Sequence, residues 1–213
     1  MQKELQRKLI HICSLAIPIV YIWTPRETAA LILGALTAVG LIVEFLRVKV
    51  DAVDRFILKA VGPMLRPHET RQGKGRISGA TWVLFSATLC VLVFPKVVTV
   101  TAFTVLIISD TAAALVGRPF GRHRFLRKSV EGTSAFLVSA ISVVLVYALF
   151  FDASLPFVFV GAAAALVAAL VEAVSYGARI DDNLTIPLSF GAVFWSGLSV
   201  VGGPEGQRLL LVN

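Results

Sequence analysis

The sequence predicts an all-α integral membrane protein that forms a single polytopic domain over residues 1–213. Hydrophobic residues make up 57% of the chain and charged residues only 15%, which is too apolar for a soluble domain of this length. The apolar residues also gather into segments long enough to cross a bilayer, and basic stretches separate these segments. Composition and segmentation therefore agree on the fold class.

We expect about seven transmembrane helices, or six if the first lies partly in the interface. They cover residues 9–24, 28–46, 79–94, 97–117, 133–151, 155–178 and 185–201. Several are short for a full span, so tilt or local thinning of the bilayer is expected at their ends. Basic residues precede the first segment, as in a signal peptide. A small-residue cleavage site is lacking before Trp23, so a retained first helix is predicted.

Positive charge predicts the orientation of the helices. All but three of the 20 Lys and Arg residues fall at the N-terminus or in the loops after the second, fourth and sixth helices. The exceptions are Arg26, Lys96 and Arg208. The positive-inside rule then puts the N-terminus in the cytoplasm and the C-terminus outside the cytoplasmic (inner) membrane. Such a basic face attracts phospholipid headgroups or nucleotides. Nucleic acid is not expected, because the chain has no soluble basic domain or aromatic platform.

The linker at about 47–76 predicts an amphipathic helix on the cytoplasmic interface. Apolar residues recur at i, i+3, i+4 and i+7 between Val53 and Leu65, and charged residues fill much of the remaining surface. Gly62-Pro63 is suited to end the helix. A lipid-surface anchor and a structural strap remain equal alternatives. The basic stretch at 71–76 suits either a mobile lid that contacts phosphate or a solvated loop.

Residues 109–134 are the most informative stretch for function. Asp110 is a single acid inside an apolar run, and small residues at helical spacing follow it. At about 100° per residue, one narrow helical stripe is shared by Asp110, Ala114, Gly117 and Gly121. A carboxylate in an apolar setting is costly unless it is paired, and a cation that carries phosphates would pair it. The alternative is a helix-packing stripe with the acid paired to an arginine.

Glu172 is the second acid set well within a predicted span. Asp110 lies eight residues before Arg118, and Glu172 lies seven before Arg179. Both carboxylates should therefore lie roughly 10–12 Å below the cytoplasmic loops at about 1.5 Å rise per residue. Equal depth on two helices is what a shared cation site requires, although coincidence would give the same pattern.

The same loops lead into three helix N-termini that carry Ser78, Ser129 and Asn183. Helix N-termini bind phosphate through unpaired N–H groups, but each residue could equally be a plain N-cap. Carboxylates below and basic residues above form the arrangement that phosphoryl transfer uses. His11, at the cytoplasmic end of the first helix, is either a packing residue or a base for a lipid hydroxyl. Glu44 has a ready partner at i+3 and is interpreted as structural.

These segments resemble the polyprenol kinase family, which includes dolichol kinase, phytol kinase and the CTP-dependent diacylglycerol kinase of fungi. The central motif is Asp110-x-x-Ala-x-x-x-Gly117-x-x-x-Gly121, followed by Arg127-Lys128-Ser129-x-Glu131-Gly132. The resemblance also includes Arg7-Lys8-Leu9-Ile10-His11 and Glu172 with Asp181-Asp182-Asn183-Leu184-Thr185-Ile186-Pro187. The loop from Gly121 to Lys128 is shorter than in dolichol kinases, which disfavours dolichol itself as the substrate.

The resemblance implies a membrane lipid kinase that transfers the γ-phosphoryl group of CTP to a lipid alcohol, such as diacylglycerol or a polyprenol- or phytol-type isoprenoid. We expect the catalytic residues to be Asp110, Lys128, Glu131 and His11. The expected nucleotide-binding residues are Ala114, Gly117, Arg118, Gly121, Arg122, Ser129, Gly132 and Asn183. The expected Mg²⁺ ligands are Asp110, Glu172 and Asp182. The site would face the cytoplasm at the loop at about 118–132. Whether the chain forms a homodimer is left open by the sequence.

Two other functions remain to be weighed. The central motif is also similar to that of CDP-diacylglycerol synthases, in which the phosphate of phosphatidate attacks CTP and releases pyrophosphate. Those enzymes carry a longer polar loop than the compact span from Glu172 to Pro187. A non-enzymatic anion or lipid transporter would need a polar path to the outer face, and the outer halves of these helices have almost no charged residues.

Overall fold

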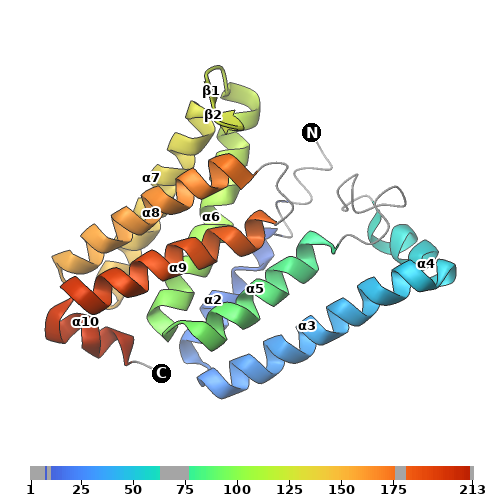
Figure 1. The fold of residues 1–213 in the computed structure, drawn as a ribbon, viewed down its shortest axis with the longest axis horizontal. Helices are drawn as coiled ribbons and strands as arrows, with labels where there is room; N and C mark the ends of the chain where they lie inside the picture. Colours follow the sequence, from blue (N-terminus) through green and yellow to red (C-terminus); the bar gives the residue numbers. More distant parts are fainter. Residues whose placement is uncertain (1–7, 9–10, 63–76, 176–180, 212–213) are drawn as a thin grey trace.

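The computed structural model describes residues 8, 11–62, 77–175 and 181–211. These residues form a helical bundle with one short β-hairpin at its upper end in Figure 1. The elements in chain order are α2 (Ala16–Trp23), α3 (Arg26–Lys49), α4 (Asp51–Val61), α5 (Gly79–Val93), α6 (Lys96–Phe120), β1 (Arg124–Phe125), β2 (Lys128–Ser129), α7 (Val130–Phe150), α8 (Leu155–Ser175), α9 (Asp182–Val201) and α10 (Gly203–Leu210).

Five of the described helices are long and apolar enough to cross a membrane: α3, α6, α7, α8 and α9. The segment His11–Trp23 and α5 are apolar but shorter. Each predicted apolar segment thus coincides with a helix, and the all-α membrane class agrees with the structure. The count of seven spans and the orientation of the termini stay predictions.

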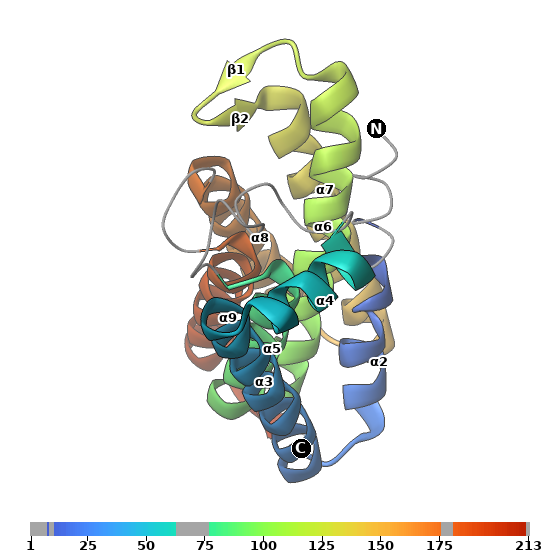
Figure 2. The same ribbon diagram turned by 90° about the vertical axis from the view of Figure 1, so that its right-hand side faces the viewer.

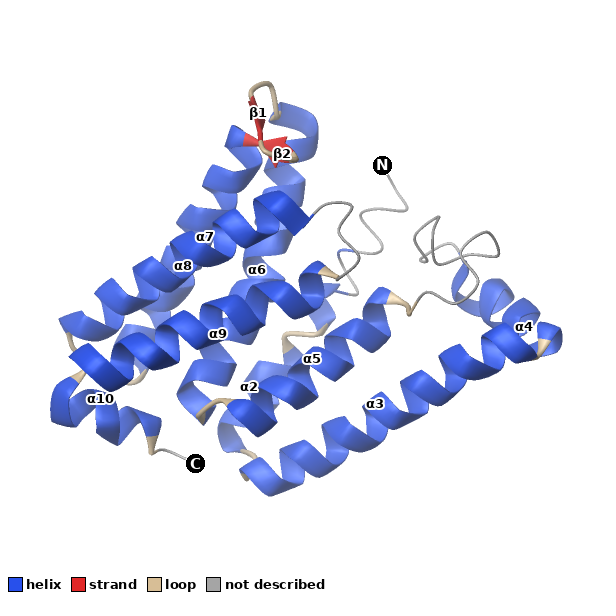
Figure 3. Ribbon diagram, viewed as in Figure 1, coloured by secondary structure: helices blue, strands red, loops and turns tan. Residues whose placement is uncertain are grey.

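Helix α6 is the centre of the bundle, with α2, α7 and α9 packed against it. Its buried residues include a nearly continuous run from Lys96 to Ile107. On the periphery, large apolar side chains such as Leu149, Phe159 and Val200 are exposed. Exposed apolar side chains on spanning helices are expected to face lipid. Helix colours in Figure 3 show how little of the described chain lies outside helices.

Helices α6 and α7 come unusually close at their glycines. A Cβ atom placed on Gly117 would lie 3.1 Å from the Cα atom of Gly132 and 3.3 Å from Ser129 Oγ. A Cβ on Gly121 would lie 2.7 Å from the same hydroxyl. These glycines therefore allow α6 and α7 to pack closely, as the helix-packing alternative predicted. Their predicted contact with a nucleotide stays a prediction.

The predicted loop at about 118–132 contains regular secondary structure. Helix α6 continues to Phe120, and a β-hairpin precedes α7. Leu126 has φ 51° at the hairpin turn, a left-handed conformation that costs a leucine about 1–2 kcal/mol. The next residue, Arg127, donates its backbone N–H to the carbonyl of Ala173 at 3.2 Å. This bond fixes the hairpin on the end of α8. Neither the hairpin nor α10 was predicted from the sequence.

Helix α4 is the predicted amphipathic helix. Val50 is extended, with φ −125° and ψ 103°, and it separates α3 from α4. The chain therefore turns sharply, and α4 lies across the end of α3 in both Figure 1 and Figure 2. Gly62 follows α4 as its C-cap, as expected. The predicted continuation to Leu65 and the basic stretch at 71–76 lie outside the described residues.

Candidate functional site

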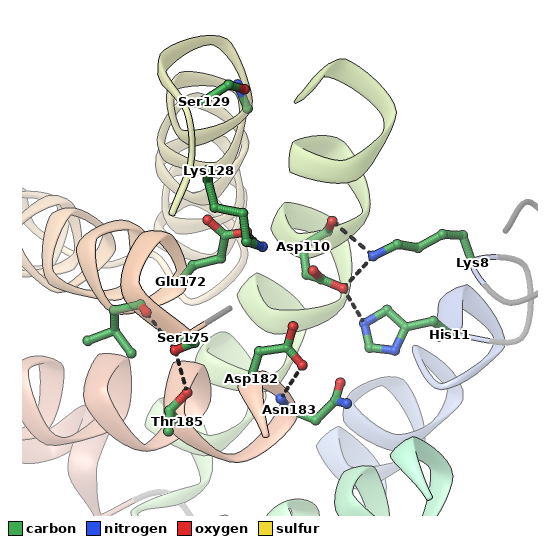
Figure 4. Close-up of polar contacts among 12 residues, drawn as sticks. Lys8, His11, Asp110, Lys128, Ser129, Glu172, Ser175, Asp182, Asn183 and Thr185 are labelled. Carbon is green, nitrogen blue, oxygen red and sulfur yellow. Dashed lines mark hydrogen bonds and ion pairs between the residues drawn. The ribbon is translucent and has the colours of Figure 1, made fainter. Parts of the chain in front are cut away.

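Asp110 lies in the buried part of α6, where it is paired with Lys8 and contacted by His11, both from the N-terminal segment. Lys8 Nζ donates to Asp110 Oδ2 at 2.5 Å and to the Asp110 backbone carbonyl at 3.0 Å. His11 Nε2 lies 3.5 Å from Asp110 Oδ2. These side chains are at most 15% exposed, so the charge of Asp110 is compensated where water is scarce. Figure 4 shows Lys8 and His11 both directed at this carboxylate.

Glu172 on α8 is paired with Lys128, which the hairpin delivers. Lys128 Nζ donates to Glu172 Oε1, and only 2% of the Glu172 side chain is exposed. The second oxygen, Oε2, is buried and accepts no hydrogen bond from any described residue. A buried carboxylate oxygen without a donor is costly, so this atom is available to a ligand.

The two ion pairs form one group of alternating charges, here called the site cluster: Lys8, His11, Asp110, Lys128 and Glu172. Lys128 acts electrostatically on Asp110 as well as on Glu172. Glu172 in turn experiences the negative charges of Asp110 and Asp182. In Figure 4, Lys128 extends between Glu172 and Asp110, with Asp182 directly below. The site cluster thus joins residues from four segments, and α9 adds Asp182 beside it.

Asp182 and Asn183 begin α9 beside this cluster. Asp181, and not Asn183, is the N-cap, because its Oδ1 accepts from the Asn183 backbone N–H at 3.0 Å. The Asn183 side-chain amide donates to the same Oδ1 at 2.6 Å, and Asp182 Oδ1 accepts from the Asn183 backbone N–H at 3.1 Å. Asn183 is buried and its amide N–H is engaged within the turn. Its predicted hydrogen bond to a nucleotide stays a prediction.

Ser129 and Glu131 hold the base of the hairpin. Ser129 caps α7, since its Oγ accepts from the backbone N–H of Gly132 at 3.2 Å. Ser78 caps α5 in the same way, through the backbone N–H of Thr81. Glu131 Oε1 lies 2.7 Å from His123 Nδ1 and also accepts from the His123 backbone N–H at 3.3 Å. These contacts stabilise the helix starts and the hairpin. The catalytic role of Glu131 stays a prediction.

Three other predicted site residues lie on α6 or just after it. Ala114 is half-buried one helical turn after Asp110, while Arg118 and Arg122 are exposed near the end of the helix. Lys8, to which no role was assigned from the sequence, is 5% exposed and contacts Asp110 directly. The signal was its place three residues before His11, a spacing that puts two side chains on one side of a helix.

The described residues contain no group of three His, Cys, Asp or Glu side chains with the geometry of a metal site. Asp110, Glu172 and Asp182 are neighbours, and the ammonium group of Lys128 lies between Asp110 and Glu172 (Figure 4). Mg²⁺ is usually held by one or two carboxylates together with substrate phosphates, and it does not need a cage made entirely of protein ligands. The unsatisfied Glu172 Oε2 and the adjacent Asp110 fit this kind of shared coordination.

Comparison with known proteins gives two relatives. An uncharacterised Rickettsia prowazekii protein, RP860, is 32% identical over 189 residues, which cover 88% of this chain and 91% of that protein. A phytol kinase of Synechocystis is 34% identical over 93 residues, or 41% of this chain and 39% of the kinase. The chain therefore matches well under half of the phytol kinase's length. No family model and no solved structure matches the chain.

Proposed function

We propose that this chain, which belongs to the same family as the Rickettsia protein, is a membrane lipid kinase of the polyprenol kinase kind. It transfers the γ-phosphoryl group of CTP to a lipid alcohol, such as diacylglycerol or a phytol- or polyprenol-type isoprenoid. The partial similarity to a phytol kinase supports the reaction class. The choice of CTP rests on the resemblance of the central motif to polyprenol kinases.

The observation that carries the proposal is the pair of buried lysine–carboxylate contacts, Lys8–Asp110 and Lys128–Glu172. Phosphoryl transfer needs fixed positive charges near the transferred group and oxygen ligands for a divalent cation. A lysine ammonium is a compact charge on a flexible stem. Lys8 and Lys128 can therefore turn from a carboxylate to a phosphate when a nucleotide binds, and the carboxylates then become available to Mg²⁺.

Each member of the site has a role in this proposal. Asp110, Glu172 and Asp182 would hold Mg²⁺, which neutralises and orients the phosphates. Lys128, with Arg118 or Arg122, neutralises the remaining phosphate charge.

In the transfer itself, the lipid oxygen forms a bond to the γ-phosphorus while the bond from that phosphorus to the bridging oxygen breaks, which releases CDP. His11 accepts the hydroxyl proton. The lipid tail stays in the bilayer, and the hydroxyl enters laterally between helices. Positioning and charge supply most of the rate enhancement.

Product analysis tests the proposal. The purified protein in lipid vesicles is incubated with Mg²⁺, a panel of lipid alcohols and CTP or ATP labelled on the base or the γ-phosphate. A kinase transfers the γ-label to the lipid and releases CDP. Release of pyrophosphate with phosphatidate as acceptor, and no labelled lipid phosphate, would instead indicate the cytidylyltransferase. The Asp110→Asn protein is the matched inactive control.

A further inference from the structure

The outward face of α4 is a feature that the proposed reaction does not use. In Figure 2, α4 lies across the end of α3, a helix long enough to span a membrane, whereas α2 and α6 run more nearly upright. A helix that lies across the end of spanning helices occupies the interface between hydrocarbon and water. The position of α4 therefore brings it to lipid headgroups, and its side chains decide what it does there.

A buried ionic network fixes the rotation of α4 about its own axis. Arg47, near the end of α3, donates to Asp54 on α4 at 3.4 Å and to Glu44 at 3.0 Å. Glu44 Oε1 also accepts from the backbone N–H of Ser78, at the start of α5, at 3.1 Å. We call Glu44, Arg47 and Asp54 the strap cluster. Because Asp54 is 3% exposed and held by Arg47, the opposite side of α4 must face outward.

That outward side combines one aromatic residue with basic ones. Phe56 is 69% exposed, and Ala52 and Ala60 lie one turn away on either side of it. Arg55 and Lys59 are exposed beside this ridge, against a single exposed acid on α4, Asp51, and Lys49 at the end of α3 is exposed as well. An exposed aromatic ring flanked by basic side chains is typical of helices that lie on anionic membranes. In such helices the aromatic ring enters the boundary between headgroups and acyl chains, while the long basic side chains reach headgroup phosphates.

We infer that α4 is a docking surface for anionic phospholipids, with Phe56 inserted below the headgroups and Arg55 and Lys59 bound to their phosphates. The exposed face carries net positive charge, which complements the negative charge of an anionic bilayer surface. Each basic residue near such a surface strengthens binding to it by roughly fivefold. The strap cluster presents this face to the lipid. In this inference the structural strap and the lipid-surface anchor lie on opposite sides of one helix.

Site-directed quenching tests the inference without any measurement of activity. Cys13 and Cys90 are the free cysteines of the described chain. In a Cys13→Ser/Cys90→Ala background, bimane is attached to Phe56→Cys, and the full chain is placed in nanodiscs. Two disc preparations are compared. One contains brominated phosphatidylglycerol, and the other contains the same fraction of brominated phosphatidylcholine. Asp51→Cys, on the polar side of the same helix, is the control, and Ala60→Cys is a second reporter.

We expect strong quenching at residues 56 and 60 and little at residue 51. We also expect brominated phosphatidylglycerol to quench more than brominated phosphatidylcholine, and Arg55→Gln/Lys59→Gln to remove this difference. Quenching at residues 56 and 60 no greater than at residue 51 would show that α4 faces water, and the inference would be wrong. Equal quenching by the two lipids, or a preference that survives the double charge variant, would equally overturn it.

Discussion

The site cluster and the strap cluster are both buried groups of charge at the same end of the bundle, but they are built differently. The strap pairs join residues that are three and seven positions apart, across a single helical elbow. The site pairs join residues that are 102 and 44 positions apart. The strap cation is an arginine, while the site cations are lysines. Local pairs thus shape an elbow, and distant pairs exist only because the whole bundle has assembled.

The difference indicates which cluster is needed for chemistry. A buried ion pair is often no more stabilising than apolar residues of the same size, so burial of charge alone is no sign of a structural benefit. The arginine fork of Arg47 ties two carboxylates into a fixed geometry, which suits a strap. A lysine ammonium is a compact charge on a flexible stem, so the lysine pairs of the site cluster can exchange partners. We therefore expect variants of the site cluster to lose turnover and variants of the strap cluster to lose stability.

The largest expected effect is on turnover in Asp110→Asn. Loss of a ligand carboxylate should lower the rate by ~10³-fold or more, because several kcal/mol of transition-state stabilisation disappear. Asp54→Asn is the matched control in the strap cluster and should keep its turnover per folded molecule. Lys8→Gln/Asp110→Asn removes both charges of the pair and should fold but stay inactive. Near-normal turnover of Asp110→Asn at low Mg²⁺ would contradict the assignment of a cation site.

Lys128→Ala should lower the rate by ~10²-fold, which is comparable to the loss of one fixed donor to a developing charge. Lys128→Arg should restore only part of this rate, since the guanidinium differs in reach and shape. Steady-state kinetics in vesicles measure both. Lys96 lies at the opposite end of α6, where its Nζ donates to the Thr24 carbonyl at 3.0 Å, and Lys96→Ala should leave turnover unchanged. Full activity of Lys128→Ala would make Lys128 only an anchor under the positive-inside rule.

The strap cluster should respond mainly in stability. Arg47→Ala removes the guanidinium that Glu44 and Asp54 share, and the loss of one partner from a buried ion pair should cost about 3–5 kcal/mol in the free energy of unfolding. Unfolding in detergent, followed by circular dichroism, measures this loss, and an assay of the remaining folded protein measures turnover. A fall in turnover per folded molecule as large as that of Lys128→Ala would erase the distinction between the two clusters.

A smaller effect should appear as a changed requirement for Mg²⁺. Glu172→Gln keeps the size of the side chain but removes its charge, and the apparent affinity for Mg²⁺ should fall about 10-fold. Titration of activity with Mg²⁺ at saturating nucleotide measures it, and chelation with EDTA should abolish the activity of both proteins. An unchanged Mg²⁺ titration would show that Glu172 only holds Lys128, and the shared cation site would then be wrong.

The sequence predicted the helices more completely than the site. Hydrophobic segments predict spanning helices directly, and the i+3 spacing of Glu44 and Arg47 predicted their ion pair. The ion pair between Asp110 and Lys8 was not predictable, because it depends on how the N-terminal segment packs against α6. The hairpin was missed since its strands have two residues each and its turn contains Leu126 at positive φ, where glycine or asparagine is the usual signal. Local patterns thus predicted local structure, and long-range pairs needed the fold.

The smallest effect is expected at Glu131, where the sequence predicted a catalytic residue and the structure shows a contact with His123. If Glu131 acts only through that contact, Glu131→Gln and His123→Ala should each reduce turnover about threefold, because an exposed ion pair contributes little. Their double variant should be no worse than either single variant, since both changes remove one interaction. A catalytic Glu131 would behave otherwise: its loss would exceed ~10²-fold and would persist when His123 is already alanine. Kinetics of the three proteins therefore decide whether the hairpin base belongs to the site cluster or, like the strap cluster, only supports the fold.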